Sequence, residues 1–179
     1  MDISELKVKN ETLWNQLREA RCSDPEIYHS ILMRTKTLLD KYEISFYLGF
    51  GTLLGAYRDK CFIAKDEDAD ILILEKDENK LVEAIKSESF DEIKLDLFRV
   101  INPLLISIGT RMQYLDIYIF RSHGNIYRCG DYCIEKWRLD TPDKIKFYGT
   151  DFSIPKDVES YLERIYGDWK TPSNKHAET

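Results

Sequence analysis

Apolar residues recur along the chain at two different spacings, and these spacings predict which segments are helical and which are extended. Helical spacing is found at residues 11–20, 23–42, 52–58, 77–85 and 155–166. Apolar runs typical of strands are found at residues 44–48, 68–74, 93–100, 104–108, 114–120, 144–148 and 151–154, the last two as a predicted hairpin. Residues 123–140 have a mixed pattern that begins with a turn. Helices at both ends flank a mixed set of strands, so we expect an α/β or α+β fold, a mixed β-sheet flanked by helices.

One domain accounts for nearly the whole chain. The 179 residues are 43% hydrophobic, which is enough to bury one proper core, and they contain no internal repeat or low-complexity linker. We expect a single domain over residues 1–172, followed by a flexible tail at 173–179. Within the domain, we expect N-terminal helices in 1–42, a catalytic core in 43–120, and a C-terminal hairpin and helix in 121–172.

The composition limits the expected partners and compartment. The net charge is −6 with both signs interspersed, so no nucleic acid partner is expected. The N-terminus lacks the apolar region of a signal peptide, and no run approaches the roughly 20 apolar residues of a membrane span. Four scattered cysteines do not suggest a disulfide scaffold. We therefore expect a cytoplasmic protein without an integral membrane segment.

The most informative chemistry lies in an acidic stretch that leads into an apolar strand. Asp66, Asp68 and Asp70 alternate with other residues, so on a strand they share one face, while Ala69 and Ile71 point into the core. Carboxylates crowded on one face repel one another and raise each other's pKa, unless a cation lies between them. Oxygen ligands without nearby His or Cys favour Mg²⁺ or Mn²⁺ over zinc.

Two further segments complete a candidate site for phosphate chemistry. Asp116 is a lone acid in an otherwise apolar strand, where it is costly unless paired or ligated. If that strand lies beside residues 68–74, Asp116 completes a metal-binding triad. Gly51 permits close backbone approach, and a helix that begins at Thr52 directs free N–H groups at a phosphate. Together these parts predict phosphoryl or nucleotidyl transfer.

Each part also has a purely structural interpretation. An Asp-x-Asp pair at a strand edge is usually solvated, and Gly-Thr before a helix is a common N-cap. The two motifs in this order, followed by a buried strand aspartate, are much more specific than either alone. His123, Cys129 and Cys133 have unconvincing spacing for zinc.

At this point the motifs resemble those of the LicD/fukutin family. Residues 46–58 read FYLGFGTLLGAYR and residues 61–71 read CFIAKDEDADI. The family typically has Gly-Thr-Leu-Leu-Gly-Ala-x-Arg, then Gly-Phe-Ile-Pro-Trp-Asp-Asp-Asp-x-Asp. This chain departs from that pattern at Cys61, Ala64, Lys65 and Glu67. Residues 114–117 and the closing segments 147–149, 154–155 and 166–169 also resemble family elements.

The resemblance implies a DNA-polymerase-beta-like nucleotidyltransferase fold used for phosphotransfer. By position in the motifs, Asp68, Asp70 and Asp116 would hold Mg²⁺ or Mn²⁺. Asp116 or Asp66 is expected to assist deprotonation as well, because the base must lie within hydrogen-bond reach of the acceptor. Gly51 and Thr52 would contact the phosphates of the donor. Arg58 would support the site or offset its charge. Lys65 would either contact a phosphate or be a solvated side chain.

The expected reaction follows from the same resemblance. A hydroxyl of a glycan or small acceptor attacks the distal phosphorus of a CDP-linked donor such as CDP-choline, CDP-glycerol or CDP-ribitol, and CMP leaves. Two alternatives remain open: transfer of a nucleotide from a nucleoside triphosphate to a small molecule or protein, and a binding module that has lost catalysis. Release of CMP indicates phosphotransfer, whereas release of pyrophosphate indicates nucleotidyl transfer.

Overall fold

The computed structural model of the chain describes residues 25–63, 66, 68–87, 97–102, 105–109 and 114–172. The helix expected over 11–20 and the candidate residue Lys65 lie outside these residues. In the described part, no helix is both long enough and apolar enough to span a membrane.

The described residues form an alternation of helices and strands, several of them short. The helices are α2 (Pro25–Lys41), α3 (Phe50–Leu54), α4 (Glu78–Ser87), α6 (Lys136–Asp140) and α7 (Val158–Tyr166), with a π-helical turn at Gly55–Asp59 and a 3-10 turn at Glu75–Asp77. The strands are β1 (Phe46–Leu48), β2 (Asp68–Leu74), β3 (Leu97–Asn102), β4 (Leu105–Gly109), β5 (Tyr114–His123), β6 (Ile126–Cys129), β7 (Tyr132–Glu135), β8 (Asp143–Phe147) and β9 (Thr150–Ile154).

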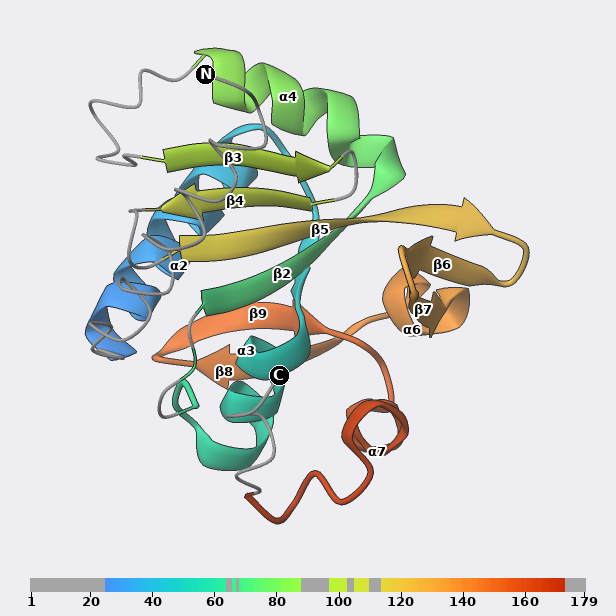
Figure 1. The fold of residues 1–179 in the computed structure, drawn as a ribbon. Helices are drawn as coiled ribbons and strands as arrows, with labels where there is room; N and C mark the ends of the chain where they lie inside the picture. The colour runs from blue at the N-terminus through green and yellow to red at the C-terminus, as the bar shows by residue number, and fades with distance from the viewer. Residues whose placement is uncertain are drawn as a thin grey trace, which may run out of the picture.

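The main sheet is mixed, as the sequence predicted. In the described part of the chain its strand order is β1-β2-β5-β4-β3, and β6 and β7 continue from β5. β2 and β5 run parallel, whereas the other pairs run antiparallel. Figure 1 shows β5 reaching past β2 towards the β6–β7 hairpin and α6. Strands β8 and β9 form a separate two-stranded sheet, the predicted hairpin, and β9 contacts β1.

The mixed segment 123–140 is more regular than its sequence pattern suggests. After a turn, it forms the β6–β7 hairpin followed by α6. Each of these two strands has one buried residue, Cys129 in β6 and Ile134 in β7. A strand with one buried position gives no alternation to detect, which is why this hairpin was missed.

Two helix boundaries differ from the predicted ones. The helix expected from Thr52 begins at Phe50, whose φ of +37° is unusual for a bulky residue. The last helix was expected to begin at Pro155 but begins at Val158, because Asp157 before it has a left-handed backbone conformation with φ +52°. That helix ends before Gly167, as predicted, with Gly167 at φ +66°.

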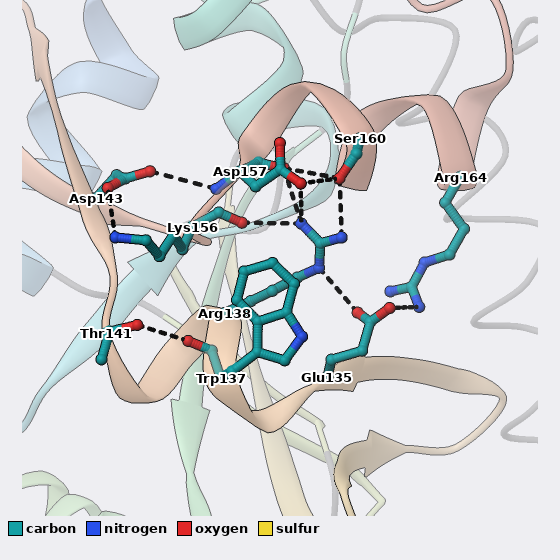
Figure 2. A network of polar contacts seen from close by, with 9 residues as sticks. All are labelled: Glu135, Trp137, Arg138, Thr141, Asp143, Lys156, Asp157, Ser160 and Arg164. Atoms are coloured by element: carbon teal, nitrogen blue, oxygen red, sulfur yellow. Dashed lines mark hydrogen bonds and ion pairs between the residues drawn. The ribbon is translucent and has the colours of Figure 1, made fainter.

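A buried arginine joins α6 to the start of α7 (Figure 2). Arg138 is 6% exposed, and its guanidinium donates four hydrogen bonds. The acceptors are Glu135 Oε2 at 2.9 Å, the Lys156 carbonyl at 2.9 Å, the Asp157 carbonyl at 2.8 Å and Ser160 Oγ at 2.8 Å. The Cζ atom of this guanidinium lies over the Trp137 ring, 4.4 Å from the ring centre. Arg138 is therefore a structural centre of the C-terminal part.

Candidate active site

The parallel pairing of β2 and β5 brings two aspartates side by side. Asp70 on β2 is the register partner of Asp116 on β5, so the two side chains point to the same face of the sheet. Asp70 is 4% exposed and Asp116 is 5% exposed. The sequence analysis made the site conditional on the Asp116 strand lying beside residues 68–74, and the structure shows these two strands paired.

The other two predicted carboxylates approach the same place from the start of β2. Asp68 is the first residue of β2 and lies two positions before Asp70, on the same face and half-buried. Asp66 was expected to be part of this strand, but the strand begins at Asp68. Asp66 instead belongs to the preceding loop, where its N–H donates to the Ile63 carbonyl at 3.1 Å and its own carbonyl accepts from the Tyr28 hydroxyl at 3.2 Å.

Burial of Asp70 adds to the expected arrangement of β2. The sequence pattern placed Ala69 and Ile71 in the core and the aspartates together on the other face, and β2 is buried on both of these faces from Ala69 onward. The face of Asp70 is covered by α3, which contacts β2. The carboxylates of Asp70 and Asp116 thus lie in an interior position, where the surrounding protein screens their charges less than water would.

The charges of the four acids act on one another. The pKa of Asp70 is raised well above its usual range, first by burial and then by the negative charges of Asp68, Asp66 and Asp116. The N–H of Gly51 opposes this shift by donating to the carboxylate. Mutual repulsion of this kind is relieved when a cation binds between the acids.

The donor set suits a hard divalent cation, although the described structure does not hold these side chains in a coordinating arrangement. Among the described residues, no three His, Cys, Asp or Glu side chains are placed so that they could hold a metal ion. The carboxylates would therefore have to turn towards one another to do so. Buried carboxylate oxygens are nevertheless the ligands that Mg²⁺ prefers, so the chemistry of Asp68, Asp70 and Asp116 fits such an ion.

Three hydrogen bonds hold Asp70 in place, two of them with the Gly-Thr motif and one with Gly49. The Gly51 N–H donates to Asp70 Oδ2 at 3.1 Å, and the buried Thr52 Oγ1 accepts from the Asp70 N–H at 2.8 Å. The Gly49 N–H donates to the Asp70 carbonyl at 3.1 Å. The motif therefore positions the carboxylate, and its expected contact with donor phosphates stays a prediction.

Arg58 interacts with the C-terminal segment. Its Nε and Nη2 donate to the Asp59 carboxylate at 2.8 and 2.7 Å, and its Nη1 donates to the Trp169 carbonyl at 3.1 Å. Next to it, the Tyr57 ring packs edge-on against the Trp169 ring at 5.6 Å. These contacts tie the turn after α3 to the segment that follows α7.

Sequence reasoning missed the aromatic residues beside the carboxylates. Burial raises the pKa of the Tyr118 hydroxyl, and the charges of Asp70, Asp116 and Asp68 raise it further. The pKa of Tyr166 is raised by burial and by the charge of Asp70. For Tyr118 the sequence did contain a signal, because it lies two residues after Asp116 on the same strand and so on the same face.

We expect Thr52→Val to lower both stability and activity. The valine keeps the shape of the side chain but removes the oxygen that accepts from the Asp70 N–H. An unsatisfied buried N–H costs about 1–3 kcal/mol. Denaturant unfolding should show that loss, whereas Thr52→Ser, which keeps the hydroxyl, should recover most of it. Equal unfolding midpoints for the valine and serine variants would contradict this role.

We expect Gly51→Ala to reduce activity more than stability. An added Cβ would lie 2.5 Å from Asp66 Oδ2 and 3.5 Å from Asp70 Oδ2, so the Asp66 carboxylate must move. Displacement of a catalytic group by about 1 Å can cost about a hundredfold in rate. The turnover number should therefore fall about 10- to 100-fold, while the free energy of unfolding changes by less than about 1 kcal/mol. A variant that keeps full turnover would show that Asp66 takes no part in catalysis.

Comparison with known families identifies the domain. Residues 43–157 match the family described as LicD/FKTN/FKRP, nucleotidyltransferase domain. A curated relative, the uncharacterized protein RT0683 of Rickettsia typhi, is 27% identical over 163 residues, in a match that covers 86% of this chain and 50% of that protein. The chain thus spans about half the length of the curated relative that it matches.

Comparison with solved structures shows the fold. A crystal structure of ANT(2")-Ia in complex with adenylyl-2"-tobramycin has a TM-score of 0.51 at 15% identity, covering 82% of this chain and 82% of that chain. A solution structure of the antibiotic-resistance factor ANT(2'')-Ia has a TM-score of 0.50 at 13% identity, covering 83% and 77% respectively. The expected Pol-beta-like nucleotidyltransferase fold, a mixed sheet with helices, is therefore confirmed.

Proposed function

The chain belongs to the LicD/FKTN/FKRP family through its nucleotidyltransferase domain, and we propose that it is a Mg²⁺-dependent phosphotransferase. It moves a phospho-headgroup, phosphocholine or a similar polyol phosphate, from a CDP-linked donor to a hydroxyl of a glycan or small acceptor. The observation that carries this proposal is the register of Asp70 with Asp116, two buried acids on adjacent parallel strands.

In the proposed reaction, the four acids have two roles, acceptance of a proton and binding of Mg²⁺. An acceptor oxygen forms a bond to the distal phosphorus while the bond from that phosphorus to the bridging oxygen breaks, and CMP leaves with the bond's electron pair. Asp66 or Asp116 accepts the proton of the acceptor hydroxyl, for which it must lie within hydrogen-bond reach. Asp68, Asp70 and Asp116 would hold Mg²⁺, which when bound offsets the charge on the transferring phosphate.

The backbone around α3 supports the donor side of this proposal. Gly51 and Thr52 lie next to Asp70, so a donor phosphate at the acids also meets this turn. Lys65 is proposed as a further phosphate contact. Arg58 supports the site indirectly, since its donors hold the C-terminal segment against the turn after α3.

A product assay combined with calorimetry tests the proposal. CDP-choline, CDP-glycerol, CDP-ribitol, CTP and ATP are each titrated into the protein with and without Mg²⁺, and the titrations are repeated with Asp70→Asn. We expect Mg²⁺-dependent binding of a CDP-linked compound, lost in the variant, and release of CMP when glycerol or a glycan is supplied as acceptor. Preference for a triphosphate with release of pyrophosphate would favour nucleotidyl transfer instead. No binding in any condition would favour a degenerate binding module.

A further inference from the structure

Three aromatic rings form a cluster beside the carboxylates. The ring centre of Phe50 lies 4.7 Å from that of Tyr118 and 4.6 Å from that of Tyr132, and the two tyrosine rings are 6.1 Å apart. The planes are inclined by 61°, 56° and 89° in these pairs, so both pairs with Tyr118 are edge to face and the Phe50–Tyr132 pair is tilted. They come from the start of α3, the middle of β5 and the start of β7.

The position of the cluster follows from strand geometry. Tyr118 is two residues from Asp116 on the same face of β5, a separation of about 6–7 Å along the strand. Phe50 is directly before Gly51, whose N–H donates to Asp70. The rings therefore lie close to the acids, displaced from them towards the C-terminal end of β5.

The backbone holds one of these rings at a conformational cost. Phe50 has φ +37°, a region that L side chains rarely adopt, and it lies between Gly49 and Gly51. Backbone strain persists only where surrounding contacts impose it, and it is concentrated at active sites and ligand clamps. Here the Phe50 ring contacts the two tyrosines and packs against the hydrophobic core.

Tyr132 gives the cluster an open side. Its side chain is 51% exposed even though its ring packs against Phe50 and Tyr118. A supported aromatic ring with half its surface open to solvent is a stacking platform. A flat, uncharged ligand can cover that ring and gain apolar contact, and its binding does not include the free-energy cost of desolvating a charge.

We propose that Phe50, Tyr118 and Tyr132 form the subsite for the planar base of a nucleotide ligand, with Tyr132 as the stacking surface. The inference rests on the proposed function in that a nucleotide phosphate lies at the acids. In a nucleotide, one sugar separates the phosphate from the base. With the phosphate at the acids, the base therefore reaches the neighbouring rings. Stacking tolerates any base, so the cluster binds the base without selecting its identity.

Ligands that contain parts of a nucleotide test the subsite. CMP and ribose 5-phosphate are titrated, with Mg²⁺, into the wild-type protein and into Tyr132→Ala, Tyr132→Phe and Tyr148→Ala. Tyr148 is a matched control because it is also an exposed tyrosine, 40% exposed, but stacks on His29 and Phe62 instead. Because Tyr132 is half exposed, its replacement leaves the core intact.

The expected result separates base binding from a general disturbance. Tyr132→Ala should weaken CMP binding about tenfold or more, while Tyr132→Phe and Tyr148→Ala keep it within about twofold. Ribose 5-phosphate, which has no base, should bind the wild type and Tyr132→Ala equally. Equal CMP affinity in wild type and Tyr132→Ala, an equal loss for both ligands, or no CMP binding by the wild type would overturn the proposal.

Two further outcomes separate this inference from the proposed reaction. If tetramethylammonium competes with the donor only when Tyr132 is present, and CMP affinity does not change, the cluster binds a cationic headgroup and the base assignment is wrong. If the protein instead uses CTP with release of pyrophosphate, the proposed reaction is wrong. A raised KM for CTP in Tyr132→Ala, with kcat retained, would then still support the base subsite.

Discussion

Asp70→Asn will lower the rate of group transfer about a thousandfold while the protein remains folded. The charges of Asp66, Asp68 and Asp116 all act on Asp70. We therefore expect the charge of Asp70 to contribute strongly to the binding of a cation among these acids. An asparagine removes that charge but keeps an oxygen that accepts from the Gly51 N–H. The variant thus changes the electrostatics of the site with little change in its shape.

The same substitution should leave the Mg²⁺-free protein as stable or slightly more stable. A buried carboxylate beside like charges is destabilising, so its removal is expected to raise the free energy of unfolding by about 1 kcal/mol. Thermal melting without Mg²⁺ measures this change, and steady-state kinetics measures the loss of turnover. Mg²⁺ should raise the melting temperature of the wild type but not that of the variant.

Asp77→Asn is the matched control for Asp70→Asn. Asp77 is also buried, but it lies at the far end of β2, before α4, and pairs with Lys80 at 3.7 Å. Its replacement should affect stability only and leave turnover within about twofold. If Asp70→Asn retained turnover within tenfold of the wild type, or if Asp77→Asn lost as much, the assignment of the site would be wrong.

Arg138→Ala will have the largest effect on stability, a loss of about 3–5 kcal/mol in the free energy of unfolding. The arginine is almost fully buried and satisfies four acceptors from Glu135, α7 and the segment before it (Figure 2). Its removal leaves those acceptors without their donor and opens a cavity beneath Trp137. For a chain of this size, the melting temperature should fall by about 10 °C.

Two arginine variants show whether the network or the charge alone is responsible. Arg138→Lys keeps the charge but has no planar fork of donors, so it should recover less than half of the loss. Arg164 pairs with the other oxygen of Glu135 at 3.0 Å but is 38% exposed, so Arg164→Ala should cost less than about 1 kcal/mol. Equal melting temperatures for Arg138→Ala and Arg164→Ala would show that the buried network contributes no more than the surface pair.

Much of the fold could be predicted because its longer elements have local patterns. The helical spacing of 23–42 predicted α2, and the apolar runs predicted β2, β5, β8 and β9 close to their observed bounds. Short elements were less predictable, since the β6–β7 hairpin has one buried residue per strand. The start of α7 was misplaced because a left-handed residue at Asp157, and not Pro155, precedes it.

The candidate site was predictable in its residue types but not in its assembly. Asp70 and Asp116 lie 46 positions apart in the numbering, and their side-by-side placement depends on which strand pairs with β2. The contact of the Gly-Thr motif with a phosphate stays a prediction, and the structure adds that both residues are hydrogen-bonded to Asp70. Hydrogen bonds of this kind depend on the fold around them, so local sequence does not specify them.

By itself, the sequence determined the mixed helix and strand class, the family and the set of candidate acids, because these follow from local periodicity and from motifs read along the chain. Only the tertiary structure decided that Asp70 is buried and held by Gly51 and Thr52. It also decided that Phe50, Tyr118 and Tyr132, from three separate elements, meet beside the acids. The physical reason is that burial and side-chain contact depend on strand order and packing between distant segments, which local spacing does not encode.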